Sequence, residues 1–316
     1  MPFRRLFLLL PALGLAAPLA APLAAPPASP APATASAPAA AAVRIAGVMT
    51  DARLAETSGM AASRGRPGAF WVHNDSGHGA ELHLISGQGQ RLATVAIDGV
   101  ENVDWEDLAA FTLGGRRYLL VADTGDNGGI RSTLSAVVVE EPAEVTDGMR
   151  LTPAWTLRFR WPDGARDCEA VAVDAAAGEV LLVSKKRVPP ELFRIALRPA
   201  SDEVQTARRV GRLRGIEQPT AAELQRNPVY GRYRAQVSAA DLSPDGRTLA
   251  VLNYQAVYLY RREAGAGWSS LDRPQRLDFA WMPQAEAVGF SLDGRELWVA
   301  GEQRPSPLVR FVLAAP

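Results

Sequence analysis

The stretch Ser238-Ala-Ala-Asp-Leu-Ser-Pro-Asp-Gly-Arg247 recurs, 48 residues further on, as Glu286-Ala-Val-Gly-Phe-Ser-Leu-Asp-Gly-Arg295. In both copies an Asp-Gly pair separates two short apolar runs, and Asp-Gly is a favoured turn between antiparallel strands. Three earlier stretches, which begin at Ser58, Glu106 and Glu169, repeat the same order of a polar residue and two apolar runs. Five copies of one unit in a single chain indicate a repeat architecture.

Each unit continues with further short apolar runs, so four strands per unit are expected. Four units have a fourth run, at 91–97, 154–161, 206–213 and 276–281. The fifth unit ends without one, but residues 43–49 match residues 91–97 at the same spacing and precede the first unit. Four-stranded units in series are typical of β-propellers. The sequence therefore predicts an all-β, five-bladed β-propeller that an N-terminal strand closes in the last blade.

A six-bladed propeller is the alternative, with one weakly marked blade inside residues 198–237. Residues 215–237 lack paired apolar runs and fit a long loop better, apart from a short helical pattern at 220–225. Three roles stay open for this loop: a lid over the channel, a wall of a pocket, or a packed decoration.

The first forty residues differ in composition from the rest. Arg4 and Arg5 precede a short apolar run, and small residues follow, as in a cleavable signal peptide. We expect a signal peptide at 1–21, an Ala/Pro-rich tether at 22–42 and a single propeller domain at 43–316. The protein should then be periplasmic or secreted, monomeric, and not stably inserted in a membrane.

Composition excludes several classes of protein. Lys and Arg total 34, as do Asp and Glu, whereas a nucleic-acid-binding protein would carry a basic excess. Cys168 is the single cysteine, which excludes an internal disulfide and a cysteine-based zinc or iron–sulfur site. We expect Cys168 to be a buried apolar residue.

The first strand of each unit starts with an oxygen-bearing side chain. First strands line the central channel of a propeller, so these equivalent positions should form one ring at the channel mouth. The ring consists of Ser58, Glu106, Glu169, Ser238 and Glu286. Converging carboxylates repel one another unless a cation lies between them, and Ca²⁺ accepts oxygen ligands in loose geometry. The sequence predicts a calcium site here; alternatively, the ring accepts backbone N–H groups and joins neighbouring blades.

The Ser–Glu–Glu–Ser–Glu order around five blades resembles the calcium-activated nucleotidases, the soluble apyrase family. The resemblance covers most of residues 43–316 in repeat order and spacing, and it implies one axial Ca²⁺ and hydrolysis of phosphoric esters. Two features of that family have no counterpart. Its Asn-rich Glu-Trp segment after the second blade is replaced by Asp123-Thr-Gly-Asp-Asn127, and its basic residue after the fourth blade by Asn253-Tyr-Gln.

A second resemblance rests on longer motifs. His73-Asn-Asp-Ser-Gly, Asp104-Trp-Glu-Asp-Leu-Ala and Asp123-Thr-Gly-Asp-Asn together resemble uncharacterised secreted bacterial propellers described as phytase-like or esterase-like. That group has no established activity, so the resemblance implies a fold and no reaction.

Loops that follow the second strands should form the rim of the same mouth. We expect six of their residues to contact a small anionic or polar ligand: Asn74, Asp123, Asn127, Lys185, Lys186 and Arg187. Asp75 or Asp126 would be catalytic and orient an attacking water. Asp, Asn and Gly are also common turn formers, so a purely structural role is the alternative.

Two functions remain open at this point. One is a calcium-dependent hydrolase of a phosphoric ester, and the other is a non-catalytic scaffold that binds a protein or polysaccharide and has a structural ion. A third, hydrolysis of a lactone or sugar ester, requires an Asn or Asp among the axial ligands, and the predicted ring contains none.

Overall fold

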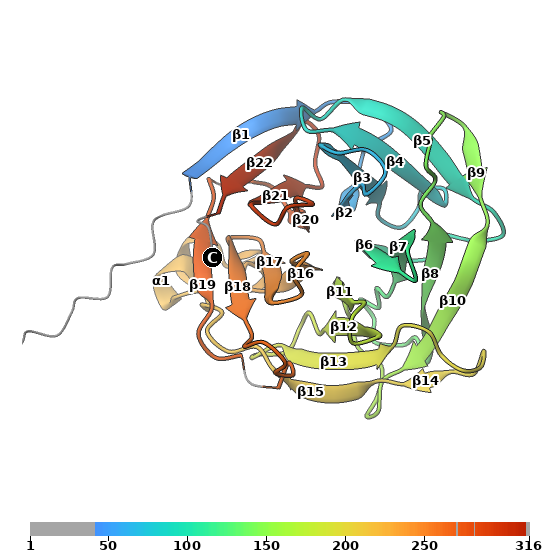
Figure 1. The fold of residues 1–316 in the computed structure, drawn as a ribbon. Coiled ribbons are helices and arrows are strands. Elements are labelled where there is room, and N and C mark those ends of the chain that lie inside the picture. The colour runs from blue at the N-terminus through green and yellow to red at the C-terminus, as the bar shows by residue number, and fades with distance from the viewer. Residues whose placement is uncertain (1–41, 270, 281, 314–316) are drawn as a thin grey trace, which may run out of the picture. The chain divides into compact units, whose positions relative to one another are not determined.

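The computed structural model describes residues 42–269, 271–280 and 282–313, and within them five β-sheets surround a central axis (Figure 1). The predicted signal peptide (1–21) and all but the last residue of the predicted tether (22–42) lie outside the described residues. The prediction of a five-bladed β-propeller is confirmed.

Every blade has four antiparallel strands, which follow one another from the axis outward. Blade 1 consists of β2 (Thr57–Ala62), β3 (Ala69–Asn74), β4 (Glu81–Ser86) and β5 (Arg91–Ile97). Blade 2 consists of β6 (Trp105–Leu113), β7 (Arg116–Asp123), β8 (Leu134–Glu140) and β10 (Pro153–Arg160). Blade 3 consists of β11 (Ala170–Asp174), β12 (Glu179–Val183), β13 (Glu191–Ala196) and β15 (Arg208–Arg212). Blade 4 consists of β16 (Val237–Leu242), β17 (Thr248–Asn253), β18 (Ala256–Arg261) and β19 (Gln275–Asp278). Blade 5 consists of β20 (Ala285–Phe290), β21 (Glu296–Gly301), β22 (Ser306–Val312) and β1 (Ala42–Met49).

The ring closes between the two ends of the described chain. Strand β1 pairs antiparallel with β22, from Ala42 opposite Val312 to Met49 opposite Ser306, as the sequence predicted. The two repeated Asp-Gly pairs lie in the turns that connect the first and second strands of blades 4 and 5. Gly246 and Gly294 adopt φ of 69° and 68° there, which a residue with a side chain rarely does.

Two short strands, absent from the prediction, cover the outer edges of blades. Strand β9 (Met149–Leu151) comes from the chain between β8 and β10, and it pairs in parallel with β5 of blade 1. Strand β14 (Gln205–Thr206) comes from the connection to β15, and it pairs in parallel with β10 of blade 2. An open edge can pair with a foreign strand, and these additions reduce that exposure.

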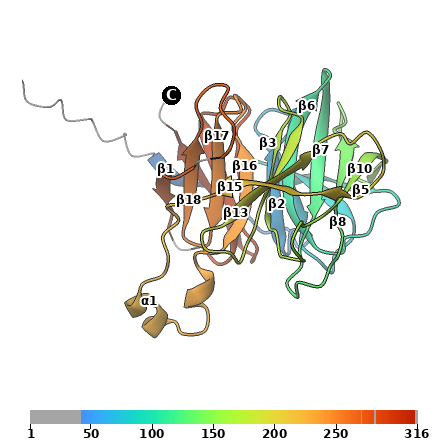
Figure 2. The same cartoon turned by 90° about the horizontal axis from the view of Figure 1, so that it is seen from below.

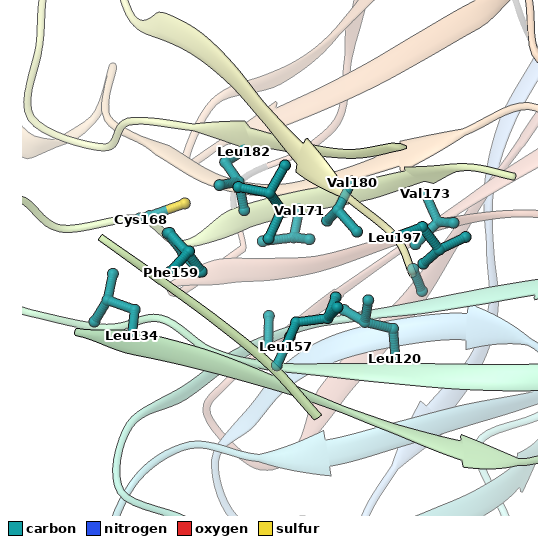
Figure 3. Close-up of a cluster of buried hydrophobic side chains, with 14 of the residues drawn as sticks. Leu120, Leu134, Leu157, Phe159, Cys168, Val171, Val173, Val180, Leu182 and Leu197 are labelled. Carbon is teal, nitrogen blue, oxygen red and sulfur yellow. The ribbon is translucent and has the colours of Figure 1, made fainter. Parts of the chain in front are cut away.

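Apolar side chains fill the space between neighbouring blades. Figure 3 shows one such cluster, in which Leu120 and Leu157 of blade 2 face Val171 and Val180 of blade 3. Cys168 is fully buried in this cluster, as expected. Apolar side chains pack on both faces of each blade in this way. As a result, every residue of inner strands such as β2 and β11 is buried, without the alternation of a half-exposed strand.

A buried carboxylate ties three inner strands together at the axis. Asp107 on β6 accepts N–H groups from Leu108 (2.9 Å), Val171 (2.8 Å) and Ala240 (3.0 Å). These donors belong to blades 2, 3 and 4. Because N–H groups from three blades converge on this one side chain, Asp107 fixes the relative positions of the three blades.

The chain between β15 and β16 forms no sixth blade. It contains α1 (Ala221–Arg226) and a 3-10 turn, η1 (Gly231–Tyr233), which project from one face of the ring (Figure 2). Thr220 and Glu223 form a capping box that starts α1, which confirms the short helical pattern. Within the described residues, no helix combines the length and the hydropathy needed to cross a membrane.

Candidate functional site

Five carboxylates from three blades meet at one mouth of the channel. They form two groups that share one member, and ligand oxygens within each group lie within 4.8 Å of one another. The first group is Asp75, Asp104 and Glu106, and the second is Glu106, Asp167 and Glu169. We refer to these five residues as the acidic cluster. Its members follow β3, precede or begin β6, and precede β11.

Glu106 at the centre of the cluster lacks hydrogen-bond donors. Glu106 is only 5% exposed. Within the described residues, no N–H or O–H group donates a hydrogen bond to its carboxylate. Burial, and then the charge of Asp75, raises the pKa of Glu106 well above its ordinary value. Burial and the charge of Asp75 also raise the pKa of Asp104, to about 6. Two neighbouring carboxylates without donors are stable only with a bound proton or a bound cation.

Gly125 permits the close approach of these two carboxylates. A Cβ atom at Gly125 would lie 2.2 Å from Glu106 Oε1 and 2.3 Å from Asp104 Oδ2, both far inside contact distance. The Gly125 N–H donates to the Asp104 backbone carbonyl at 3.1 Å. The glycine of the 123–127 motif therefore leaves the space in which Asp104 and Glu106 converge.

The aspartates of the same motif hold its loop. Asp126 accepts the N–H groups of Ile130 (2.8 Å) and Arg131 (3.1 Å), and its own N–H donates to Asp167 Oδ1 (2.9 Å). Asp123 pairs with the Arg131 guanidinium at 2.7 Å. Both oxygens of Asp126 are engaged by backbone groups, whereas Asp75, the other predicted catalytic residue, lies in the acidic cluster.

Lys185 and Lys186, which were predicted to contact a ligand, form ion pairs with the cluster. Lys185 Nζ contacts Glu169 Oε1, and both side chains are at least nine-tenths buried. Lys186 Nζ lies 3.0 Å from Asp167 Oδ2 and 2.9 Å from the Asn127 carbonyl. Arg187 is exposed. Ammonium groups thus contact Asp167 and Glu169, while the group of Asp75, Asp104 and Glu106 has no such contact within the described residues.

The remaining members of the predicted ring make different contacts. Ser58 Oγ donates to the Glu106 carbonyl at 3.0 Å, and Ser238 Oγ donates to the Ala285 carbonyl at 2.6 Å. Each serine therefore joins its blade to the next one. Glu286 accepts the Tyr254 hydroxyl at 2.9 Å and belongs to neither carboxylate group. Burial and the charge of Glu302 raise the pKa of Glu286.

Asn74 holds the loop that leads into the first blade. Its Oδ1 accepts the Glu56 N–H at 3.1 Å, and its Nδ2 donates to the Arg53 carbonyl at 2.7 Å. The neighbouring Asp75 N–H donates to the Glu56 carbonyl at 2.8 Å. The predicted ligand-binding Asn74 thus also positions a member of the acidic cluster.

Asp104 and Asp167 were not among the predicted metal ligands. Each stands two residues before a ring glutamate, in Asp104-Trp-Glu106 and Asp167-Cys-Glu169. This repeated Asp-x-Glu spacing was the signal that could have identified them. The same position holds Glu56, Gln236 and Gln284 in the other three units.

The donor set of Asp75, Asp104 and Glu106 fits Ca²⁺. All three supply carboxylate oxygens, which a hard cation prefers, and no thiolate or imidazole ligand joins either group. A bound cation would neutralise these three carboxylates and lower the pKa values that burial has raised.

No family model and no curated protein matches the chain. Among solved structures, the chain is similar to the PQQ-bound aldose sugar dehydrogenase of Streptomyces coelicolor, with 12% identity over 88% of this chain and 100% of that one and a TM-score of 0.44. It is also similar to a luciferin-regenerating enzyme, with 9% identity over 86% and 95% of the two chains and a TM-score of 0.44. A third similarity is to U3-55K, with 14% identity over 81% and 68% of the chains and a TM-score of 0.38. Similarity at this level concerns the fold at most, so the resemblance to the calcium-activated nucleotidases stays a prediction.

Proposed function

We propose that the protein is an exported propeller that binds Ca²⁺ in the acidic cluster and hydrolyses a small phosphoric ester at the channel mouth. The observation that carries the proposal is the pair formed by the half-buried carboxylate of Asp104 and the buried carboxylate of Glu106, which converge on Gly125 without a hydrogen-bond donor. The predicted signal peptide at 1–21 supports export to the periplasm or beyond the cell, where calcium is more abundant than in cytosol.

Each side chain at the mouth has a part in this proposal. A bound Ca²⁺ would polarise the ester and stabilise negative charge that develops on it. Lys186, which contacts Asp167, and the exposed Arg187 would attract the anionic ester. Asp75 would orient the attacking water beside the bound ion. Asp126 is less suited to that role because backbone N–H groups engage both of its oxygens.

A non-catalytic scaffold is the second candidate, and two observations favour it. The hydroxyls of Ser58 and Ser238 join blades in place of coordinating an ion. Lys185 and Lys186 neutralise part of the cluster without a metal. In this case the mouth would present a polar surface to a protein or polysaccharide.

Thermal unfolding of the purified protein with EDTA, and then with Ca²⁺ restored, tests the cation site. At a free Ca²⁺ concentration of 100 times Kd, binding stabilises the native state by about 2.7 kcal/mol, which is roughly 5 to 10 °C in Tm for a domain of this size. Glu106→Gln should abolish the calcium-dependent rise. Glu286→Gln is the matched control, because Glu286 lies outside both carboxylate groups and should leave the rise intact.

The outcomes separate the candidates. If Glu286→Gln also removes the calcium-dependent rise in Tm, the ion binds in the predicted ring of five residues and not in the acidic cluster. Equal Tm values with EDTA and with Ca²⁺ would exclude the cation site. If Ca²⁺ binds and yet no nucleotide or other phosphate ester is turned over, the scaffold becomes the better proposal.

A further inference from the structure

A cavity of about 420 Å³ opens at the rim of the channel mouth, between blades 5 and 1. Its lining consists of Ala55, Glu56, Gln284, Glu302, Gln303 and Arg304. These residues come from the loops that enter β2 and β20 and from the loop that follows β21. We refer to this cavity as the rim pocket.

The rim pocket adjoins the acidic cluster. Glu56, in its wall, accepts the Asp75 N–H at 2.8 Å through its carbonyl. The carboxylates also interact, because burial and the charges of Asp75 and Glu56 together raise the pKa of Glu302. A ligand in the rim pocket would therefore lie beside the carboxylates that are proposed to hold the cation.

The lining is mostly polar and presents closely spaced donors and acceptors. The Gln303 amide donates to Gln284 Oε1 at 2.6 Å, and the Gln284 amide contacts the Glu302 carboxylate. Glu56 lies 3.3 Å from His78 Nδ1, and Arg304 adds a guanidinium. Hydroxyl groups both donate and accept, so they match a wall of amides and carboxylates. Two carboxylates, Glu56 and Glu302, against one guanidinium, Arg304, make the lining unfavourable for a phosphate group.

Gln284 maintains an unfavourable backbone conformation at this site. Its φ of 42° lies in the left-handed region, and it is the one non-glycine residue with positive φ within the described part of the chain. The Glu302 N–H donates to the Gln284 carbonyl at 2.9 Å and holds this conformation. Glycine would adopt this conformation at lower cost.

We propose that the rim pocket binds the hydroxyl-rich, sugar-like part of the substrate. This inference deepens the proposed function, because it makes the ester that of a sugar or another polyol. The phosphoryl group would lie toward the acidic cluster, and the polyol would hydrogen-bond to Gln284, Gln303 and Glu302.

Ligand-observed NMR titration of the full-length protein in EDTA tests the proposal without turnover. The probes are glucose and sorbitol, with inorganic phosphate and putrescine as comparison ligands. We expect both polyols to bind at millimolar concentration and phosphate to bind at least tenfold more weakly. Since neither the cation nor catalysis is involved, this result is independent of the test for calcium and hydrolysis.

Three variants assign the binding to the pocket. Gln303→Ala should weaken polyol binding at least tenfold, and Gln275→Ala, an equally exposed glutamine on β19, should leave it unchanged. Gln284→Gly should weaken binding while keeping Tm at or above that of the wild type, because it relieves the left-handed backbone. Absence of polyol binding would overturn the proposal, as would binding that survives both pocket substitutions or binding of putrescine alone.

Discussion

At the scale of single residues, the candidate site depends on the lack of a side chain at Gly125. Gly125 has no Cβ, and Asp104 and Glu106 occupy the space where that atom would be. The backbone of Gly125 does not have the positive φ that requires glycine, so packing alone explains the residue. A methyl group there would push the two carboxylates apart.

Gly125→Ala should therefore weaken calcium binding at least tenfold, as measured by isothermal titration calorimetry. Gly128→Ala, in the same loop, is the matched control, since its Cβ would meet only the Ile130 side chain, at an ordinary 3.6 Å. Wild-type affinity in Gly125→Ala would mean that the cation does not lie between Asp104 and Glu106.

Residue chemistry also explains which parts of the site the sequence predicted. The repeat placed Glu106 and Glu169 correctly at the mouth, because equivalent positions of inner strands must converge there. It could not predict that the short hydroxyl of Ser58 donates to a neighbouring carbonyl. Nor could it show that the long side chain of Lys185 turns inward to Glu169. A repeat predicts backbone positions, whereas side-chain length and loop conformation decide the contacts.

At the scale of elements, β1 closes the ring through contacts on two sides. It pairs with β22 in blade 5, and its Val48 N–H donates to the Gln88 carbonyl, in the turn between β4 and β5 of blade 1, at 3.3 Å. A β-bulge between Ile45 and Gly47 accompanies this second contact. A Cβ at Gly47 would lie 2.3 Å from the Gln88 carbonyl carbon, so backbone lies against backbone here.

Gly47→Ala should lower the free energy of unfolding by about 1–3 kcal/mol, the usual cost of overpacking, in urea denaturation. Ile45→Ala serves as the control, because Ile45 is 65% exposed and its truncation should change stability by less than about 0.5 kcal/mol. Equal stability of both variants would show that the turn around Gln88 moves freely away from β1.

The elements that sequence analysis missed are those with the fewest residues. The apolar runs of the repeat predicted every blade and its closure, because each run is long enough to have a pattern. Strands β9 and β14 have 3 and 2 residues, too few for any periodicity. They form because an outer strand leaves backbone groups unpaired, and that opportunity exists only once the blades are assembled.

At the scale of the whole molecule, carboxylates with raised pKa values lie at both ends of the channel. Asp241 lies at the end opposite the acidic cluster and lines, with Arg64, a cavity of about 430 Å³. It accepts N–H groups from Leu242 and Phe290, each at 2.8 Å, and so joins blades 4 and 5. Burial raises the pKa of Asp241 to about 7. The native state then keeps a proton that the unfolded chain releases near pH 4.

The stability of the wild type relative to Asp241→Asn should therefore fall as pH rises from about 5 to 7 and stay level above that. One extra native-state proton gives a slope of at most about 1.4 kcal/mol per pH unit in urea denaturation. Asp245→Asn should show no such fall, because the pKa of Asp245 is lowered. If the difference in unfolding free energy between the wild type and Asp241→Asn stays constant from pH 5 to 7, the raised pKa of Asp241 is contradicted.

The closure of the ring has a mechanical consequence. Ala42 lies opposite Val312 in the antiparallel pair of β1 and β22, so both ends of the described chain leave the same end of one ladder. A force that pulls these two ends apart would break the hydrogen bonds between β1 and β22 one after another, as in opening a zipper, and would not load them together in shear. Under tension the propeller should give way first at blade 5, at low force, while the other four blades still resist.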